Sequence, residues 1–259
     1  MDIIFARTRY EYDSYIAFWQ VVKLSGFPTC FVDEIDPHDP NKTYIVTPIN
    51  GEWQDGWKNA YARIILWDLE WRDVRPNIPG VSEVWSSDVW YADKIGARYV
   101  TLGSHPGLCP ENPNDYRKEF DVIWFAYMVW RRSIIHTELE KFGLRMPPEY
   151  LPRPEQHQAM LRSRLCVHVH QHDRVPTISP ARWMVCAAYH LPILSETVAD
   201  PGPFVYETFW ADYRYISELA YLMLSGKYPN ELEDATHALY SRLCERQTFR
   251  ICVTEALLT

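Results

Sequence analysis

Short apolar runs alternate with segments of helical periodicity along the first hundred residues. The runs are rich in β-branched and aromatic side chains, which is typical of buried strands, and they span residues 3–6, 29–32, 44–46, 62–67, 81–86 and 98–103. Apolar side chains between residues 12 and 22 recur at helical spacing before Gly26, and residues 89–95 form a shorter helical stretch before Gly96. Buried strands that alternate with helices predict a parallel sheet with helices on both faces.

The alternation restarts after residues 104–114, a segment rich in proline, glycine and asparagine that is typical of a linker. Strands are expected at 121–127, 165–169 and 191–195, helices at 131–142 and 179–189, and a mostly helical tail from residue 212. The pattern therefore predicts an α/β protein of two Rossmann-like domains, residues 1–110 and 111–259. Such domains face each other across a cleft, and ligands bind at the carboxyl ends of their strands.

Composition narrows the function classes. Of the 259 residues 47% are hydrophobic, which excludes a disordered chain. No apolar run approaches the length of a membrane span, and the first residues do not resemble a secretory signal, so we expect a cytoplasmic protein without a membrane partner. The six cysteines form no Cys-x-x-Cys motif, which argues against a zinc ribbon or a redox pair.

Charge is distributed unevenly. The net formal charge is −8, of which the residues up to Asp115 carry −7 and the rest −1. In that second part 13 of the 16 cationic side chains are arginine, whose planar fork of donors suits phosphate and carboxylate. An anionic ligand is therefore expected on the second domain, against the alternative of ordinary surface solvation.

One motif strengthens that expectation. Ser179 suits the N-cap and Pro180 the first position of a helix that follows a strand and a polar loop. The unpaired N–H groups of a helix start attract anions, and Arg182 adds a positive charge that the helix dipole alone does not favour. Arg131 and Arg132 stand together at another predicted helix start and suit an anion in the same way.

The strand, polar loop, Ser-Pro-x-Arg helix start and following Leu-Pro-Ile-Leu-Ser-Glu of residues 165–196 resemble the donor-binding half of GT-B glycosyltransferases. The likeness is greatest to the compact kind related to spore-coat and phage sugar transferases. It implies transfer from a nucleotide-diphosphate sugar, a UDP-sugar, as co-substrate, with no permanently bound cofactor and no metal. Arg182 matches the arginine near the diphosphate. Trp183 and Met184 stand where the family has an acidic residue for the ribose, so Glu196 is a possible substitute.

The resemblance and the helix starts together give a set of candidate donor-binding residues. They are Tyr127, Arg131, Arg132, His170, Gln171, His172, Thr177, Ser179, Arg182 and Glu196.

An inverting transferase also needs a base that removes the proton of the acceptor hydroxyl. Asp68 and Glu70 follow an apolar strand of the first domain, and Asp88 follows the next strand in the equivalent way. Each is a candidate catalytic carboxylate. The alternative is that it caps a helix or pairs with an arginine nearby.

The acceptor is open. The resemblance includes phage enzymes that glycosylate hydroxymethylated pyrimidines in DNA, and the chain has eleven tryptophans, whose rings stack on bases and sugars alike. The negative first half counts against DNA, because DNA affinity depends on phosphate neutralisation. Hydroxymethylated DNA is nevertheless the acceptor that we expect.

Two other function classes remain. His168, His170 and His172 alternate along a strand at a spacing that suits zinc, and with Asp173 they have the residue types of a metal-dependent hydrolase. His168 between two valines suits a packed core position instead. A binding module that holds a nucleotide without turnover is the other alternative, since the acidic residue after Arg182 is missing.

Overall fold

The chain folds into two compact units, each built on a parallel sheet. The computed structural model describes residues 2–9, 16–47, 57–69, 77–124, 128–148, 151–172 and 179–258. Unit 1 comprises Met1–His105 and Phe249–Thr259, and unit 2 comprises Pro106–Thr248. The predicted α/β class with two parallel sheets is confirmed. The expected boundary after residue 110 places the C-terminal helix in the second domain, whereas the structure groups that helix with unit 1.

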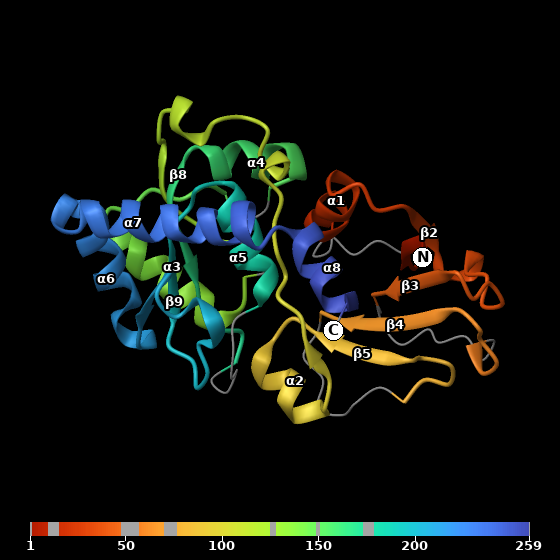
Figure 1. Ribbon diagram of the computed structural model, residues 1–259. Coiled ribbons are helices and arrows are strands. Elements are labelled where there is room, and N and C mark those ends of the chain that lie inside the picture. The colour runs from red at the N-terminus through yellow and green to blue at the C-terminus, as the bar shows by residue number, and fades with distance from the viewer. Residues whose placement is uncertain are drawn as a thin grey trace. The chain divides into compact units, whose positions relative to one another are not determined.

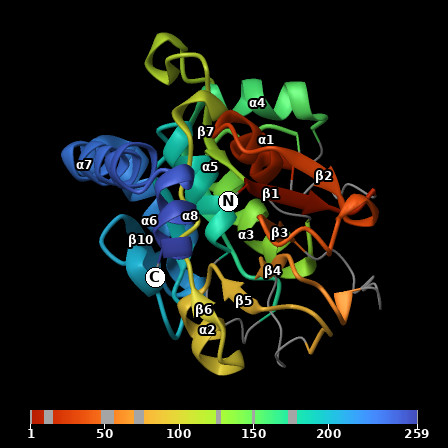
Figure 2. The same cartoon turned by 45° about the vertical axis from the view of Figure 1, so that its right-hand side comes forward.

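Unit 1 contains a sheet of six strands in the order β2-β1-β3-β4-β5-β6, all parallel. The strands are β1 (Asp2–Arg7), β2 (Thr29–Phe31), β3 (Lys42–Val46), β4 (Arg63–Asp68), β5 (Glu83–Ser86) and β6 (Arg98–Tyr99). Figure 2 shows β1, β3, β4 and β5 lying side by side. The strand order reverses between β1 and β3, which is the position where open α/β sheets bind ligands.

Successive side chains of a strand point to opposite faces, and this sheet is buried on both faces. On one face Phe5 of β1 and Trp67 of β4 pack against α1 (Ile16–Leu24) and α8 (Phe249–Leu258). On the other face Leu66 packs in a second cluster with Ile95 of α2 (Val89–Ile95). Because both faces are covered, the strands read as continuous apolar runs in the sequence.

Phe249, the first residue of α8, lies at the centre of the aromatic cluster in unit 1. Its ring is stacked on Trp67, with centroids 5.6 Å apart and planes 16° apart, and it meets Phe5, Phe18 and Phe27 at tilted or edge-on angles. The residue is fully buried. Its N–H also donates to the carbonyl of Ser104, so the C-terminal helix is tied to unit 1 by packing and by a hydrogen bond.

Unit 2 contains four parallel strands in the order β10-β9-β8-β7. The strands are β7 (Phe120–Ile123), β8 (Ser163–His168), β9 (Ile193–Glu196) and β10 (Thr208–Ala211). The α-helices are α3 (Trp130–Lys141), α4 (Arg153–Leu161), α5 (Pro180–Ala188), α6 (Ile216–Leu222) and α7 (Pro229–Tyr240). Short 3₁₀ turns occur at η2 (Val32–Glu34), η4 (Pro106–Leu108), η5 (Pro113–Asp115), η6 (Gly202–Phe204) and η7 (Tyr213–Tyr215), and π turns at η8 (Met223–Lys227) and η9 (Ser241–Arg246).

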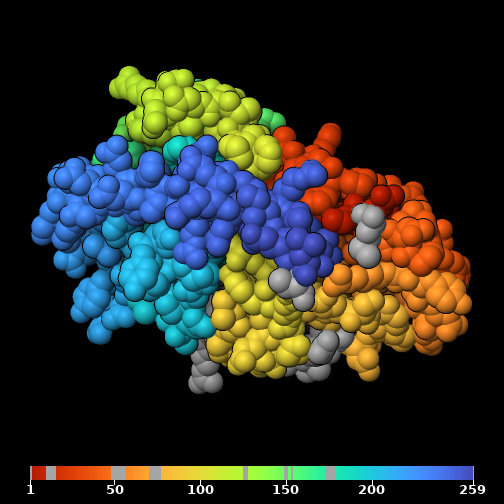
Figure 3. Space-filling view, in the orientation of Figure 1, coloured from red at the N-terminus to blue at the C-terminus, as the bar shows by residue number. Residues whose placement is uncertain are grey.

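The two faces of the second sheet are covered by different helices. α3 and α6 pack together on one face (Figure 1). Leu165 and Val167 of β8 belong to the apolar cluster that these two helices form with the sheet. α5 lies on the other face, where the indole of Trp183 donates to the hydroxyl of Thr208 at the start of β10. α7 packs on α5 and lies at the surface of the molecule in the face drawn in Figure 3. His168, the last residue of β8, points toward α5. Its Nε2 lies 3.5 Å from Arg182 in the first turn of that helix.

Most of the expected elements are present with shifted ends, and two elements were missed. The expected helix over residues 89–95 has those bounds, because Asp88 caps its start and Gly96, at φ 61°, ends it. The sequence did not predict α4 or β10. The part of the chain that the structure describes contains no helix long and apolar enough to span a membrane.

The aromatic cluster of unit 1 predicts that the last eleven residues stabilise this unit. We expect Phe249→Ala to lower the free energy of unfolding by about 3–5 kcal/mol, because it leaves a cavity between four aromatic rings. Urea unfolding of the full chain measures this difference. Leu258→Ala on the same helix is the matched control: Leu258 is 81% exposed, and we expect a change within about 0.5 kcal/mol. Similar small losses for both variants would contradict the packing described here.

Candidate functional site

Polar side chains gather at the carboxyl edge of the second sheet. β8 ends at His168 and β9 ends at Glu196, while α3 begins at Trp130 and α5 begins at Pro180. In a parallel α/β sheet the carboxyl ends of the strands and the amino ends of the following helices share one edge. Side chains that are far apart in the sequence therefore meet there.

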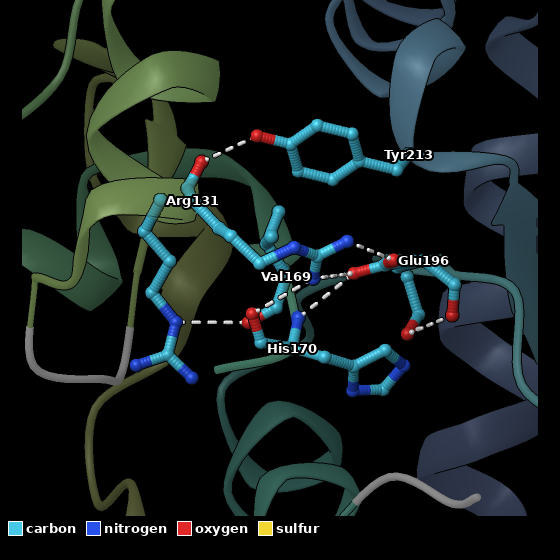
Figure 4. Close-up of polar contacts among 7 residues, drawn as sticks. Arg131, Val169, His170, Glu196 and Tyr213 are labelled. Carbon is cyan, nitrogen blue, oxygen red and sulfur yellow. Dashed lines mark hydrogen bonds and ion pairs between the residues drawn. The ribbon is translucent and has the colours of Figure 1, made fainter. Parts of the chain in front are cut away.

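A buried ion pair at this edge joins Arg131 and Glu196. The guanidinium donates to both carboxylate oxygens, at 2.7 and 3.0 Å, and the side chains are only 6% and 10% exposed. The same carboxylate accepts the N–H of His170 at 3.0 Å, and Arg131 also donates to the carbonyl of His170 at 3.1 Å (Figure 4). Bidentate geometry makes this one of the stronger kinds of ion pair.

Tyr213, just after β10, completes the arrangement around Arg131. Its hydroxyl donates to the carbonyl of Arg131 at 2.8 Å, and the Arg131 guanidinium lies 4.2 Å from the centroid of its ring. Figure 4 shows the Tyr213 ring on one side of the Arg131–Glu196 pair. One arginine therefore joins α3, the end of β8, the end of β9 and the segment after β10.

Two further arginines give this edge a positive charge. Arg132 is buried, and its Nε donates to the carbonyl of Val169 at 2.8 Å. Burial and the neighbouring Arg182 and Arg131 lower the pKa of Arg132 to about 10, so it stays charged at neutral pH. Arg182, in the first turn of α5, is partly buried and lies 3.5 Å from Nε2 of His168. Among the described side chains of this cluster three are arginines and one is a carboxylate, and this balance of charge favours an anionic ligand.

The start of α5 adds to the positive electrostatic potential at this edge. The helix begins at Pro180, as the sequence predicts, and Ser179 occupies the N-cap position without a side-chain capping hydrogen bond. Its first-turn N–H groups and its dipole therefore favour an anion at the same end that carries Arg182.

His168 and His170 line this edge as neutral rings. Both are 3% exposed, and their rings meet edge to face with centroids 4.9 Å apart. Burial lowers the pKa of His170 to about 4, an effect that Arg182 and Arg131 strengthen and Glu196 opposes. Burial, followed by Arg182, His170 and Arg132, lowers the pKa of His168 well below its ordinary value. Neither imidazole adds positive charge at neutral pH.

Some of the predicted donor-binding residues lie together at this edge. The structure brings Arg131, Arg132, His170, Arg182 and Glu196 together, and Ser179 lies at the start of the same helix as Arg182.

The other donor-binding candidates are not part of that cluster. Gln171 and His172 are exposed after the end of β8. Tyr127 and Thr177 lie outside the described residues.

The three candidate bases of the first domain have different surroundings. Asp68 is the last residue of β4 and is 1% exposed. Asp88 is the N-cap of α2, and its carboxylate accepts the N–H of Tyr91 at 3.0 Å, which is the helix-cap alternative that its position allowed. Glu70 lies outside the described residues.

The described residues give no support to the alternative of a metal-dependent hydrolase. Among the residues that the structure describes, no group of three or more His, Cys, Asp or Glu side chains is placed to hold a metal ion. His168 is a packed core residue, His172 is exposed, and Asp173 lies outside the described ranges.

Sequence reasoning missed the contribution of Tyr213. The signal that points to it is its position directly after β10, at the same sheet edge as His168 and Glu196, but the short strand was not predicted.

Comparison of the sequence with protein-family models and with curated proteins gives no match. Solved structures do match. The chain superimposes on AviGT4, a glycosyltransferase involved in avilamycin A biosynthesis, with a TM-score of 0.64 and 10% identity, over 100% of this chain and 96% of that one. The fold is one that solved glycosyltransferases share.

Two other solved structures show that proteins of different activity share this fold. The pneumococcal O-GlcNAc transferase GtfA, solved with UDP and GlcNAc, gives a TM-score of 0.52 at 9% identity, over 85% of this chain and 57% of that one. The N-terminal domain of Candida albicans trehalose-6-phosphate phosphatase gives 0.59 at 8% identity, over 99% and 96%. At such identities the likeness concerns the fold, and the activity has to be argued from the site.

The buried ion pair gives one prediction about stability. We expect Glu196→Ala to lower the free energy of unfolding by about 3–5 kcal/mol, because Arg131 then stays buried without its carboxylate. The double variant Arg131→Met with Glu196→Leu should lose less than the single variants Arg131→Met and Glu196→Leu added together. Urea unfolding measures each of these variants. As control, Glu119→Ala breaks the exposed pair with Arg162 and should cost less than about 1 kcal/mol; equal costs for the two glutamates would argue against a special role for Glu196.

A second prediction concerns the pH dependence of the free energy of unfolding. His170 has an ordinary pKa of 6.5 that folding lowers to about 4, so in this range the unfolded chain binds the proton and the folded chain does not. Stability is therefore present above about pH 6.5 and falls as the pH approaches 4. Between about pH 7 and pH 4.5 the wild type should lose about 2–3 kcal/mol more than His170→Gln, which has no proton to take up. Parallel urea titrations measure this, and identical pH profiles would contradict the assignment.

Proposed function

We propose that this protein is a glycosyltransferase that moves a sugar from a UDP-sugar to a hydroxyl acceptor. The observation that carries the proposal is the surplus of arginine at the carboxyl edge of the second sheet, in a fold that glycosyltransferases share. The likeness to spore-coat and phage sugar transferases in residues 165–196 agrees with it.

The donor's diphosphate suits this edge. Its oxygens accept hydrogen bonds, and its negative charges match Arg132, Arg182 and the start of α5, which together supply charge and donors in one place. Arg131 and Glu196 satisfy each other, so in this proposal they hold the strand ends in place and the other two arginines bind the diphosphate.

The transfer step needs a second group that faces the donor. The bond between the anomeric carbon and the diphosphate oxygen breaks, a bond from the acceptor oxygen to that carbon forms, and UDP leaves with the electron pair. A base takes the proton of the acceptor hydroxyl. We propose Asp68 or Glu70 for this role, in a GT-B arrangement of the two units. Asp88 suits it less, because its carboxylate caps α2.

Hydroxymethylated pyrimidine in DNA is the acceptor that we propose to test first. Exposed aromatic side chains such as Trp130, 67% exposed at the start of α3, suit stacking on an extruded base. The charge of the first half opposes DNA binding, and two of its arginines, Arg9 and Arg98, already pair with carboxylates. A small hydroxylated acceptor is therefore the comparison in the same assay.

Calorimetric titration with UDP, UDP-glucose, GDP and ADP tests the donor site. We expect selective binding of a uridine nucleotide, and a loss of at least about tenfold, or about 1.4 kcal/mol, in Arg182→Ala. Arg117→Ala is the matched control, because it removes an exposed arginine of the same unit, and its affinity should stay within about twofold. A folded protein that binds none of the four would refute the proposal. Binding without consumption of UDP-glucose in the presence of any acceptor would favour the noncatalytic module.

A further inference from the structure

The imidazole of His170 is buried with unused hydrogen-bonding capacity. The residue is 3% exposed, and neither Nδ1 nor Nε2 has a hydrogen-bond partner among the residues that the structure describes. Buried polar groups without partners are costly, and they are uncommon unless a ligand or water satisfies them. His168 differs in this respect, since its Nε2 lies 3.5 Å from Arg182.

The backbone of His170 is held from both sides, which fixes the position of its ring. Its N–H donates to Glu196 and its carbonyl accepts from Arg131, and the ring packs edge to face on His168. Figure 4 shows the ring extending from the backbone on the side away from Tyr213. The two nitrogens are therefore presented at a fixed place rather than on a mobile side chain.

The neighbourhood of the ring defines which ligand group suits it. Burial lowers the pKa of the ring to about 4, with Arg182 and Arg131 adding to this effect and Glu196 opposing it, so the imidazole is neutral at physiological pH. A neutral imidazole offers one donor and one acceptor. A phosphate group at neutral pH has acceptor oxygens to offer, which satisfy only the donor nitrogen. A hydroxyl both donates and accepts, so hydroxyl groups match the capacity that the ring leaves unused.

We infer that His170 binds a hydroxyl group that adjoins the diphosphate of the donor. The inference rests on the proposed function, and it deepens it by dividing the work at the site: Arg132 and Arg182 bind the charged diphosphate, and His170 binds the uncharged polyol next to it. A nucleotide sugar carries hydroxyls on both sides of the diphosphate, on the ribose and on the transferred sugar. The two sources present the same chemistry to the ring.

Titration with three ligands separates these contributions. Pyrophosphate has no hydroxyl from a sugar, UDP has those of the ribose, and UDP-glucose has both sets. We expect His170→Leu to weaken binding of UDP-glucose by at least about tenfold while binding of pyrophosphate changes by less than about twofold. An equal loss for UDP assigns the ribose, and a loss confined to UDP-glucose assigns the transferred sugar; both support the inference.

Two further variants keep the test decisive. His170→Asn and His170→Gln each restore an amide donor and acceptor, near Nδ1 and near Nε2 respectively, and the one that matches the contacting nitrogen should recover affinity to within about threefold. In the free protein His170→Leu should raise the melting temperature, because it removes two buried polar atoms without partners. A merely structural imidazole would show the opposite shift.

The outcomes that overturn the inference are distinct from those that overturn the proposed function. Equal losses of pyrophosphate, UDP and UDP-glucose binding in His170→Leu, or no loss for any of them, would overturn the role of His170 while the donor site stands. If His170→Leu does not fold, the same comparison is made with His170→Phe. A wild-type protein that binds none of the three ligands removes the donor site itself.

Discussion

The organisation of the second sheet's carboxyl edge depends on one buried ion pair. Arg131 on α3 and Glu196 at the end of β9 satisfy each other bidentately, and both also bind the backbone of His170 beyond the end of β8. Tyr213 adds a hydrogen bond from the segment after β10. The pair is buried, so its desolvation cost is high. The hydrogen bonds to the backbone offset part of this cost, and they also fix the ends of neighbouring strands. The backbone of His170 takes its position from this arrangement.

Electrostatics then divides the site into parts with different roles. The Arg131–Glu196 pair is internally neutral, while Arg132 and Arg182 add positive charge. The two histidines remain neutral because burial and the arginines beside them disfavour the charged imidazole. This division is the reason for proposing a ligand that carries a charged diphosphate next to uncharged hydroxyls. The acidic residue that holds the ribose in the similar family is missing after Arg182. Glu196, its candidate substitute, is paired with Arg131, so in this proposal the hydroxyls are left to His170.

The fold by itself leaves the chemistry open. Structures with the same architecture include glycosyltransferases and the N-terminal domain of a phosphatase, at identities of 8–10%. Parallel sheets place the ends of several strands and the starts of several helices at one edge, so they provide a position for a site without specifying the residues. In the function proposed for this chain, the arginines and histidines of unit 2 bind the donor. In unit 1 the corresponding edge carries the buried carboxylate Asp68.

The sequence by itself determined the α/β class, most strands and helices, and the placement of Arg131, Arg132 and Arg182 at helix starts. These features depend on period-two and period-3.6 patterns, on Pro180 at a helix start and on Gly96 at a helix end, all of which act between residues close in the chain. Only the tertiary structure decided that Glu196 pairs with Arg131, 65 residues away, that α8 completes the core of unit 1, and that Tyr213 supports the site. These contacts follow from the order of strands in each sheet, and a carboxylate or an aromatic ring carries no local signal of the distant partner that the sheet brings to it.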